Sequence, residues 1–299
     1  MKLLNIKIIF FILVIFIEMT TLSYGITVIK VIKPESDSDI RQLYYLKILK
    51  LSLEKTKIKY GDYKIENAVS GLQFRTANLL ADGSPLVDVM WTMTNIDREK
   101  IMLPVRIPLL KGLMGYRILI INKKDTEKFL AINRVEELKK MRALQGHDWP
   151  DTDILLANGF QVEKSTYYDG MSKMINSGRA DYFPRAINEP FDEIKKREKL
   201  NLTIEKKIRL YYFAPIYFFV NVNKPELRDR IEKGLEIAIA DGSFDKIFYS
   251  EKSIKDIIEN INNDKIKLFK LENPFLTEET KKIQNNKKYI LDINFKRKK

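Results

Sequence analysis

Arginine and aromatic side chains that follow short apolar runs are the residues of this chain best suited to chemistry. Residues 178–185 read Gly-Arg-Ala-Asp-Tyr-Phe-Pro-Arg, in which a run that suits a buried strand is broken by a proline and followed by Arg185. Arg98 comes shortly after the run that contains Trp91, and Arg75 stands at the start of an expected helix. Because a guanidinium binds a carboxylate through two parallel hydrogen bonds, these arginines favour a small acidic partner.

Each of these guanidinium groups also has candidate partners within the chain. Asp97 and Glu99 flank Arg98, and Glu189 follows Arg185 closely. Two alternatives therefore stay open for both arginines. A ligand site predicts guanidinium groups that face an open cleft, whereas internal pairing predicts buried groups matched to the protein's own carboxylates.

A second polar and aromatic loop spans residues 146–151, Gly-His-Asp-Trp-Pro-Asp, and is expected to open a helix. Trp149 is suited to wall a cleft, and Asp148 is a candidate ligand contact. Either aspartate of the loop could do acid–base work, but a carboxylate at a helix start is more simply a cap. His147 is the only histidine and is expected to order the loop by hydrogen bonding, because no Gly-x-Ser-x-Gly elbow accompanies it.

Composition excludes several classes of site. The chain has no cysteine, which rules out zinc–thiolate sites, thiol catalysis and a lipid-modified cysteine anchor. A single histidine rules out a histidine-rich metal cluster, and neither a Gly-x-Gly-x-x-Gly nor a Walker-type phosphate loop occurs. We therefore expect no metal, no cofactor and no enzymatic activity.

The first 25 residues have the pattern of a secretory signal peptide. Lys2 and Lys7 give a positive start, residues 8–17 are almost wholly apolar, and small residues precede a cleavage site expected after Gly25. An uncleaved membrane anchor is the alternative, although the apolar run is short for a span. The protein is therefore expected to be periplasmic or secreted. Without disulfides it must depend on its core, which a chain of this length can supply.

The formal net charge of +13 is spread along the chain rather than gathered in one patch. The densest basic run is the C-terminal tail, residues 296–299, and acidic residues are interleaved with lysines in the expected helices. This pattern is typical of solvated helix faces, so we predict no nucleic-acid partner. A monomer is expected.

Strand and helix patterns alternate twice along the chain. Apolar runs predict strands at 27–32, 63–69, 87–91, 116–122, 160–163, 180–183, 204–212 and 217–222. Helical spacing predicts helices at 39–55, 73–81, 134–142, 150–158, 167–177, 188–198, 225–240, 243–249 and 253–261. A glycine-rich joint at 112–115 and an extended crossing near residue 211 separate two groups of elements. We predict an α/β protein of two lobes, the second inserted into the first, with lobe 1 at 26–113 and 212–299 and lobe 2 at 114–211.

Several stretches in the same order carry a resemblance to a known family. The chain resembles the periplasmic solute-binding proteins of family 3, the amino-acid-binding type, and more closely a bacterial branch described as transporter substrate-binding domain proteins. The matching stretches cover essentially the whole chain after the signal peptide. They are Pro34-Glu35 with Asp39 and Arg41, and residues 73–75, 89–94 with 98–99, 103–108, 112–117, 146–151, 178–185 with 189, 217–220, 241–244 and 273–274.

The resemblance implies two α/β lobes of the type II periplasmic-binding-protein fold, joined by two crossover hinge strands, with a ligand held between the lobes. In amino-acid binders of this type an arginine in a Thr-x-x-x-Arg-like stretch holds the ligand's α-carboxylate. By resemblance Thr94 and Arg98 take this role. The hydroxyl that normally starts a helix of lobe 2 is replaced here by residues 146–149.

One departure from the family pattern concerns the ligand's ammonium group. Amino-acid binders carry an aspartate for it a few residues beyond a Gly-Arg-x-Asp pattern, and here Ala186 stands at or near that position, next to Arg185. A guanidinium repels an ammonium at close range. An ordinary α-amino acid is therefore not expected unless Glu189 or Glu35 supplies the missing charge.

These observations together predict a secreted, non-enzymatic binding protein for a small polar, anionic ligand. It would close about joints at 112–115 and 210–213 and hand the ligand to an ABC permease or report it to a membrane sensor. The alternatives are a secreted enzyme on the same scaffold, or a sensing or partner-binding protein whose cleft is filled by its own side chains. The expected ligand contacts are Arg75, Trp91, Thr94, Arg98, Asp148, Trp149 and Arg185.

Overall fold

The computed structural model describes residues 25–32, 41–67, 73–252 and 266–291, together with residues 254, 255 and 257. The predicted signal peptide up to residue 24, the basic tail and the candidate ammonium partner Glu35 lie outside these residues, as does most of the helix predicted over 253–261. No helix in the described part of the chain is long and apolar enough to cross a bilayer.

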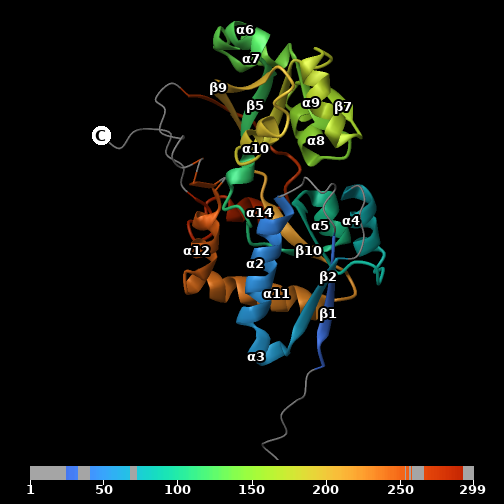
Figure 1. Ribbon diagram of the computed structural model, residues 1–299. Coiled ribbons are helices and arrows are strands. Elements are labelled where there is room, and N and C mark those ends of the chain that lie inside the picture. Colours follow the sequence, from blue (N-terminus) through green and yellow to red (C-terminus); the bar gives the residue numbers. More distant parts are fainter. Residues whose placement is uncertain are drawn as a thin grey trace, which may run out of the picture.

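Two mixed sheets organise the chain into two lobes, one below the other in Figure 1. The sheet of lobe 1 contains, in spatial order, β2 (Tyr63–Asn67), β1 (Thr27–Val31), β3 (Val89–Met93), β10 (Ile216–Val220) and β4 (Leu103–Val105). The sheet of lobe 2 contains β11 (Lys267–Lys270), β9 (Leu202–Tyr211), β5 (Tyr116–Asn122), β8 (Tyr182–Ala186), β6 (Arg142–Gly146) and β7 (Gln161–Ser165). The predicted two-lobe α/β architecture is confirmed.

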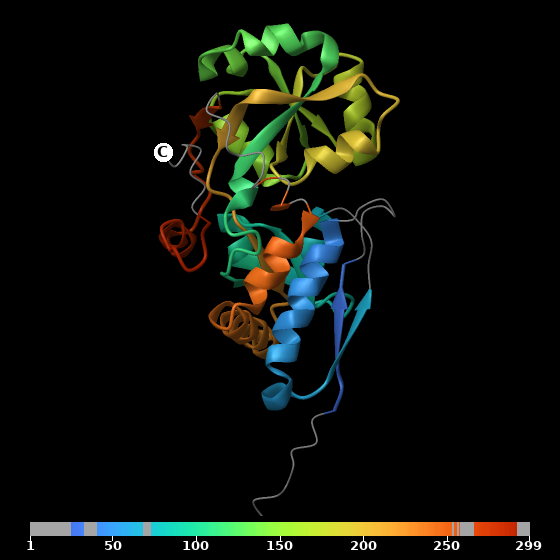
Figure 2. The ribbon, with the colours of Figure 1, turned by 60° about the vertical axis from the view of Figure 1, so that its left-hand side comes forward.

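Helices cover both faces of each sheet, as the two views in Figures 1 and 2 show. Lobe 1 carries α2 (Arg41–Lys55), α3 (Lys57–Tyr60), α4 (Gln73–Ala81), α5 (Ile96–Ile101), α11 (Pro225–Ala240), α12 (Ser243–Ser250) and α14 (Glu278–Ile283). Lobe 2 carries the 3₁₀ turn η2 (Lys123–Asp125), α6 (Thr126–Leu130), α7 (Val135–Lys139), α8 (Pro150–Ala157), α9 (Tyr168–Asn176) and α10 (Pro190–Lys195).

The core of lobe 1 follows from the alternation of side chains along its strands. Val89 and Trp91 of β3 pack with α2, α11 and α12, whereas Met90 packs on the opposite face with α4 and α14. Helices α2 and α11 approach closely at Gly234, where a Cβ would lie 1.9 Å from the backbone oxygen of Ser52. A glycine is therefore required at this helix crossing.

Strands β6 and β8 of lobe 2 differ from the sequence prediction. A helix was expected over 134–142 and a loop from Gly146, with no strand between them, but residues 142–146 form β6, which pairs in parallel with β7. Pro184 was expected to break the strand before Arg185, yet both residues lie inside β8. Strand β8 pairs along its length with β5 and only through Tyr182 with β6, so the proline's missing N–H falls where the second ladder has ended.

The predicted joints coincide with the two connections between the sheets. The first runs from β4 through the 3₁₀ turn η1 (Leu113–Gly115) to β5, and Gly112 within it has φ +83°. The second runs from β9 to β10. The two connections touch at Gly115, where a Cβ would lie 2.4 Å from the backbone oxygen of Tyr212.

A third connection, which the sequence did not predict, is made by the C-terminal segment. Strand β11 pairs in parallel with β9 of lobe 2, although residues 267–270 were assigned to lobe 1. The chain then returns to lobe 1, where the Thr277 and Thr280 hydroxyls donate to Glu99 at 3.0 and 2.7 Å. Three segments within the described part of the chain therefore connect the two lobes.

Candidate functional site

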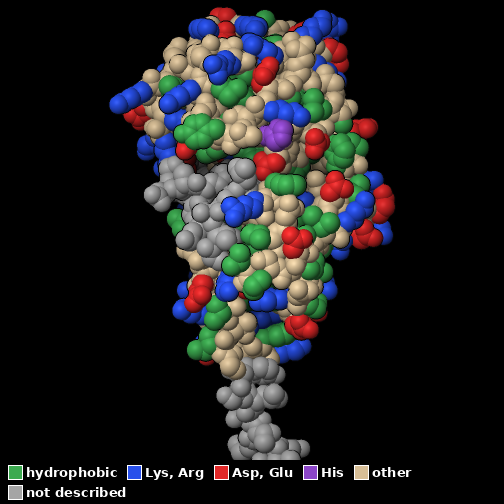
Figure 3. Space-filling model, turned by 90° about the vertical axis from the view of Figure 1, so that its right-hand side faces the viewer, with side chains coloured by type: hydrophobic (Ala, Val, Ile, Leu, Met, Phe, Trp, Pro, Cys, Tyr) green, Lys and Arg blue, Asp and Glu red, His purple; other side chains and the backbone are tan. Residues whose placement is uncertain are grey.

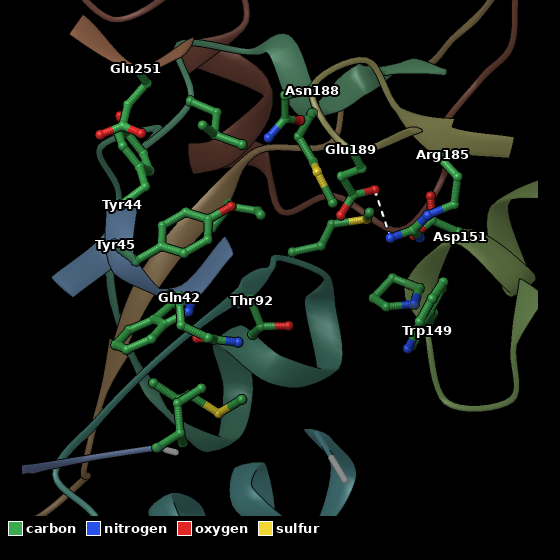
Figure 4. A pocket seen from close by; sticks show the side chains of 18 of the residues that line it. Gln42, Tyr44, Tyr45, Thr92, Trp149, Asp151, Arg185, Asn188, Glu189 and Glu251 are labelled. Atoms are coloured by element: carbon green, nitrogen blue, oxygen red, sulfur yellow. Dashed lines mark ion pairs between the residues drawn. The ribbon is translucent and has the colours of Figure 1, made fainter. Parts of the chain in front are cut away.

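A cavity of about 310 Å³ lies between the two lobes, and side chains of both form its walls (Figure 4). Its position follows from the topology, because β3 of lobe 1 and β5, β8 and α8 of lobe 2 all reach the junction between the lobes. The polar and aromatic lining residues include Gln42, Tyr45, Thr76, Trp91 and Thr92 from lobe 1, and Arg117, Trp149, Asp151, Arg185, Asn188 and Glu189 from lobe 2.

Two stacked aromatic rings form the lobe-1 wall. Trp91 of β3 packs against Tyr45 of α2, with ring centroids 5.7 Å apart and planes inclined by 27°. The centroid of the Phe218 ring lies 6.1 Å from that of Trp91, and the two planes are inclined by 81°. Trp91, a predicted contact, therefore lines the cavity in a fixed orientation. Its neighbour Thr92 also lines the cavity, whereas the predicted Thr94 does not.

Arg185 lies in the lobe-2 wall, 3% exposed and paired with two carboxylates. Its Nη2 lies 2.9 Å from Glu189 Oε2 and 2.8 Å from Glu193 Oε1, and its Nε donates to both oxygens of Glu193 at 3.0 and 3.1 Å. Both carboxylates come from the start and the first turn of α10. The geometry therefore favours the alternative in which this arginine pairs within the chain.

A second buried ion pair at the cavity was not predicted. Arg117 Nη2 lies 2.7 Å from Asp151 Oδ1, and both side chains are at most 5% exposed. The Tyr212 hydroxyl donates to the same carboxylate, and the tyrosine ring lies 5.0 Å from the guanidinium carbon. Burial raises the pKa of Tyr212 well above its usual value. One sequence signal could have indicated this pair, namely an arginine near the start of the apolar run 116–122.

Arg98 is buried between the lobes instead of lining the cavity. Its Nη1 donates to Thr92 Oγ1 at 2.6 Å and to the Met93 carbonyl at 2.8 Å, and its Nη2 donates to the Asp148 carbonyl of lobe 2 at 3.4 Å. Burial is the main cause that lowers the pKa of Arg98 to about 10. Arg98 thus acts on the cavity through Thr92.

The remaining predicted contacts lie at the rim or in the core. Asp148 Oδ2 accepts a hydrogen bond from the Phe74 N–H across the two lobes at 3.1 Å, while Arg75 is exposed on α4 and outside the lining. The Thr94 hydroxyl donates to Glu99 at 2.6 Å. Figure 3 shows the single histidine, His147, on the surface near this rim.

No group of three or more histidine, aspartate or glutamate side chains in the described ranges is placed to hold a metal ion. The side chains at the cavity offer hydrogen bonds, ring contacts and two buried ion pairs. Such a site can bind and orient a small molecule.

Comparison with known proteins supports the fold. No protein-family model matches the chain, and no curated protein sequence does. An ancestral arginine-binding protein bound to arginine is similar in structure, with a TM-score of 0.56, 16% identity, and 75% of this chain and 97% of that chain covered. A histidine kinase sensor domain with similarity to periplasmic binding proteins has a TM-score of 0.57, 14% identity and coverage of 76% and 96%.

A putative L-cystine ABC transporter protein from Listeria monocytogenes is also similar, with a TM-score of 0.51, 16% identity and coverage of 75% and 95%. At these identities the likeness shows the fold alone. The chain has the two-lobe fold of periplasmic binding proteins, which confirms the structural side of the predicted resemblance.

Proposed function

We propose that this chain is a secreted, non-enzymatic solute-binding protein that captures a small polar ligand between its two lobes. The observation that carries the proposal is the cavity of about 310 Å³ whose walls come from both lobes. This volume lies at the lower end of the range typical of small-molecule sites. A ligand that touches both walls favours the closed arrangement, and this is how hinge closure is coupled to binding.

The charges at the cavity argue for a ligand with little net charge. The sequence predicted an anion because of Arg185, but Glu189 and Glu193 already balance this guanidinium, and Asp151 balances Arg117. A ligand carboxylate would have to compete with these internal partners. Glu189 also supplies a carboxylate close to Ala186, since it accepts the Ala186 N–H at 2.9 Å. A zwitterion such as an amino-acid-like ligand is therefore compatible with the site.

Two buried polar atoms of lining residues also favour a polar ligand. Trp91 Nε1 and Asn188 Oδ1 have no hydrogen-bond partner among the residues that the structure describes. A buried polar atom left unpaired costs about 1–3 kcal/mol. A ligand with both a hydrogen-bond acceptor and a donor would remove this cost.

The names of the structural neighbours support the wider role. They include an arginine-binding protein, a sensor domain and a putative ABC transporter component. We propose that the chain acts outside the cytoplasm after cleavage behind Gly25, as a monomer. It would deliver its ligand to an ABC permease or present it to a membrane sensor.

Two observations favour a second candidate, a sensing or partner-binding protein whose cleft is closed by its own side chains. Asp148 joins the lobes through its contacts with Arg98 and Phe74, and Arg185 is buried against protein carboxylates. Small-angle X-ray scattering distinguishes the candidates. A solute-binding protein should contract when ligand is added, whereas a self-closed cleft predicts an unchanged radius of gyration.

A thermal-shift screen of residues 26–299 against amino acids, small acids and sugars tests the proposal. A ligand at 100 times its Kd stabilises the folded state by about 2.7 kcal/mol. For a chain of this size that corresponds to a rise in Tm of roughly 5–10 °C. If no compound in the screen gives a saturable rise in Tm, this result counts against the proposal.

Two neighbouring threonines provide a matched control for the placement of the site. Thr92 lines the cavity and Thr94 does not, although both are buried. Loss of a hydrogen bond of about 1 kcal/mol should make Thr92→Val weaken ligand binding roughly fivefold. Thr94→Val should change stability and leave Kd unchanged. Equal effects of the two substitutions on Kd would place the ligand elsewhere.

A further inference from the structure

The Arg185 guanidinium is enclosed by aromatic rings as well as by carboxylates. Its central carbon lies 4.8, 5.0 and 5.8 Å from the ring centroids of Phe183, Trp149 and Tyr168. All the enclosing side chains belong to lobe 2, so they stay together when the lobes move. We call this set the guanidinium cage: Trp149, Tyr168, Phe183, Glu189 and Glu193.

Contacts that do not involve Arg185 hold the cage in place. The Tyr168 hydroxyl donates to Glu193 Oε1 at 2.6 Å, which orients this carboxylate. The Trp149 and Phe183 rings are stacked, with centroids 6.3 Å apart and planes inclined by 19°. The indole rests on Gly146, where a Cβ would lie 2.4 Å from the ring. The cage is therefore preorganised by the fold.

The composition of the cage matches a guanidinium better than an ammonium. A guanidinium is planar, so carboxylates can accept hydrogen bonds at its edge while aromatic rings contact its faces. Glu193 receives a two-pronged contact from Nε and Nη2, and the three ring centroids lie within 5.8 Å of the guanidinium carbon. An ion pair alone would need none of the three rings.

Arg185 stands between this cage and the interlobe cavity. Arg185, Trp149 and Glu189 line the cavity, whereas Glu193, Tyr168 and Phe183 are not part of the lining. Figure 4 shows the arginine head beside Trp149, with its ion pair to Glu189. Shortening this side chain would therefore connect the deeper part of the cage with the cavity.

We propose that lobe 2 contains a guanidinium-binding site occupied by the chain's own Arg185, which thereby excludes guanidinium-bearing ligands from the cleft. The site is a property of lobe 2 alone. Its effect on ligand choice rests on the proposed solute-binding function. Arg185 is in this view a specificity-determining residue, and a chain with a small residue at this position accepts a free guanidinium in its place.

Chemical rescue of Arg185→Ala tests the proposal with N-ethylguanidinium as the probe, because this ion replaces the atoms that the substitution removes. We expect N-ethylguanidinium at millimolar concentrations to raise the Tm of Arg185→Ala in a saturable way, with binding at least tenfold tighter than to the unaltered protein. The neutral isostere N-ethylurea should have no such effect. A folded Arg185→Ala that shows no saturable rise, or the same rise with N-ethylurea, overturns the proposal.

Two further variants keep the test decisive. Arg185→Lys places an ammonium in the cage, and we expect it to fold and to show no response to N-ethylguanidinium. If Arg185→Ala does not fold, Arg185→Ala/Glu189→Gln leaves one buried carboxylate fewer unpaired, keeps Glu193 and takes its place in the titration. If neither variant folds, the refolding yield of Arg185→Ala must rise with N-ethylguanidinium and not with N-ethylurea. Equal refolding yields with the two compounds refute the proposal. Failure of the ligand screen with the unaltered protein would contradict the proposed function only.

Discussion

The buried pair of Arg117 and Asp151 gives the sharpest prediction about stability. Asp151→Asn keeps the size of the side chain but removes the negative charge that lies 2.7 Å from Arg117 Nη2. Arg117 is 1% exposed, and its Nε has no hydrogen-bond partner in the described part of the chain. The guanidinium would therefore stay buried without a counter-charge from Asp151.

Removing one partner of a buried ion pair typically costs about 3–5 kcal/mol. In a chain of this size 1 kcal/mol changes Tm by about 2–4 °C, so Asp151→Asn should lower Tm by on the order of 10 °C. Tyr212 adds to the effect, because its buried hydroxyl donates to the same carboxylate. An amide oxygen accepts this hydrogen bond less strongly than a carboxylate does.

Urea unfolding at neutral pH, followed by circular dichroism, measures the effect against a matched control. Asp153→Asn makes the same chemical change at an exposed position of α8 and should change the unfolding free energy by less than about 0.5 kcal/mol. Arg117→Met/Asp151→Asn removes both charges and should be more stable than Asp151→Asn alone. The reasoning is refuted if Asp151→Asn and Asp153→Asn differ by less than about 1 kcal/mol.

Two further predictions concern lobe 1. Gly234→Ala should destabilise the protein by about 1–3 kcal/mol, because the new Cβ would meet the Ser52 backbone oxygen. Urea unfolding measures this change. A gain in stability, as the higher helix propensity of alanine alone would give, contradicts the prediction. Lys55 and Ser243 lower the pKa of Asp241 to about 2, so its stabilising contribution is present above the ordinary pKa and lost as pH falls towards 2. NMR titration of its carboxyl carbon should show this value and an upward shift in Lys55→Met; an unchanged midpoint in that variant would exclude the lysine as a cause.

Local sequence signals predicted most elements because their patterns are complete within a few residues. The helix at 225–240 begins with a proline in its first turn, and the strand at 116–122 is an apolar run of sufficient length. Strand β6 was missed because its five residues contain only two apolar side chains and directly follow the helical pattern predicted over 134–142. Strand β11 has only four residues and pairs with β9, which lies far away in the sequence.

Three of the seven residues predicted to contact a ligand line the cavity. Trp91, Trp149 and Arg185 line the cavity, as expected from aromatic and basic residues near strand ends. Thr94 and Arg98 are used for internal contacts, and no periodicity in the sequence distinguishes these roles. That these residues contact a ligand stays a prediction.

The sequence by itself determined the α/β class of the fold and its two lobes, because hydrophobic periodicity and glycine-rich joints are local properties. Only the tertiary structure decided how the charges of the cleft are matched. Arg117 of β5 pairs with Asp151 of α8, and Arg185 of β8 pairs with Glu193 of α10. Burial determines such pairings, since a desolvated charge takes the nearest opposite charge that the packed elements bring to it.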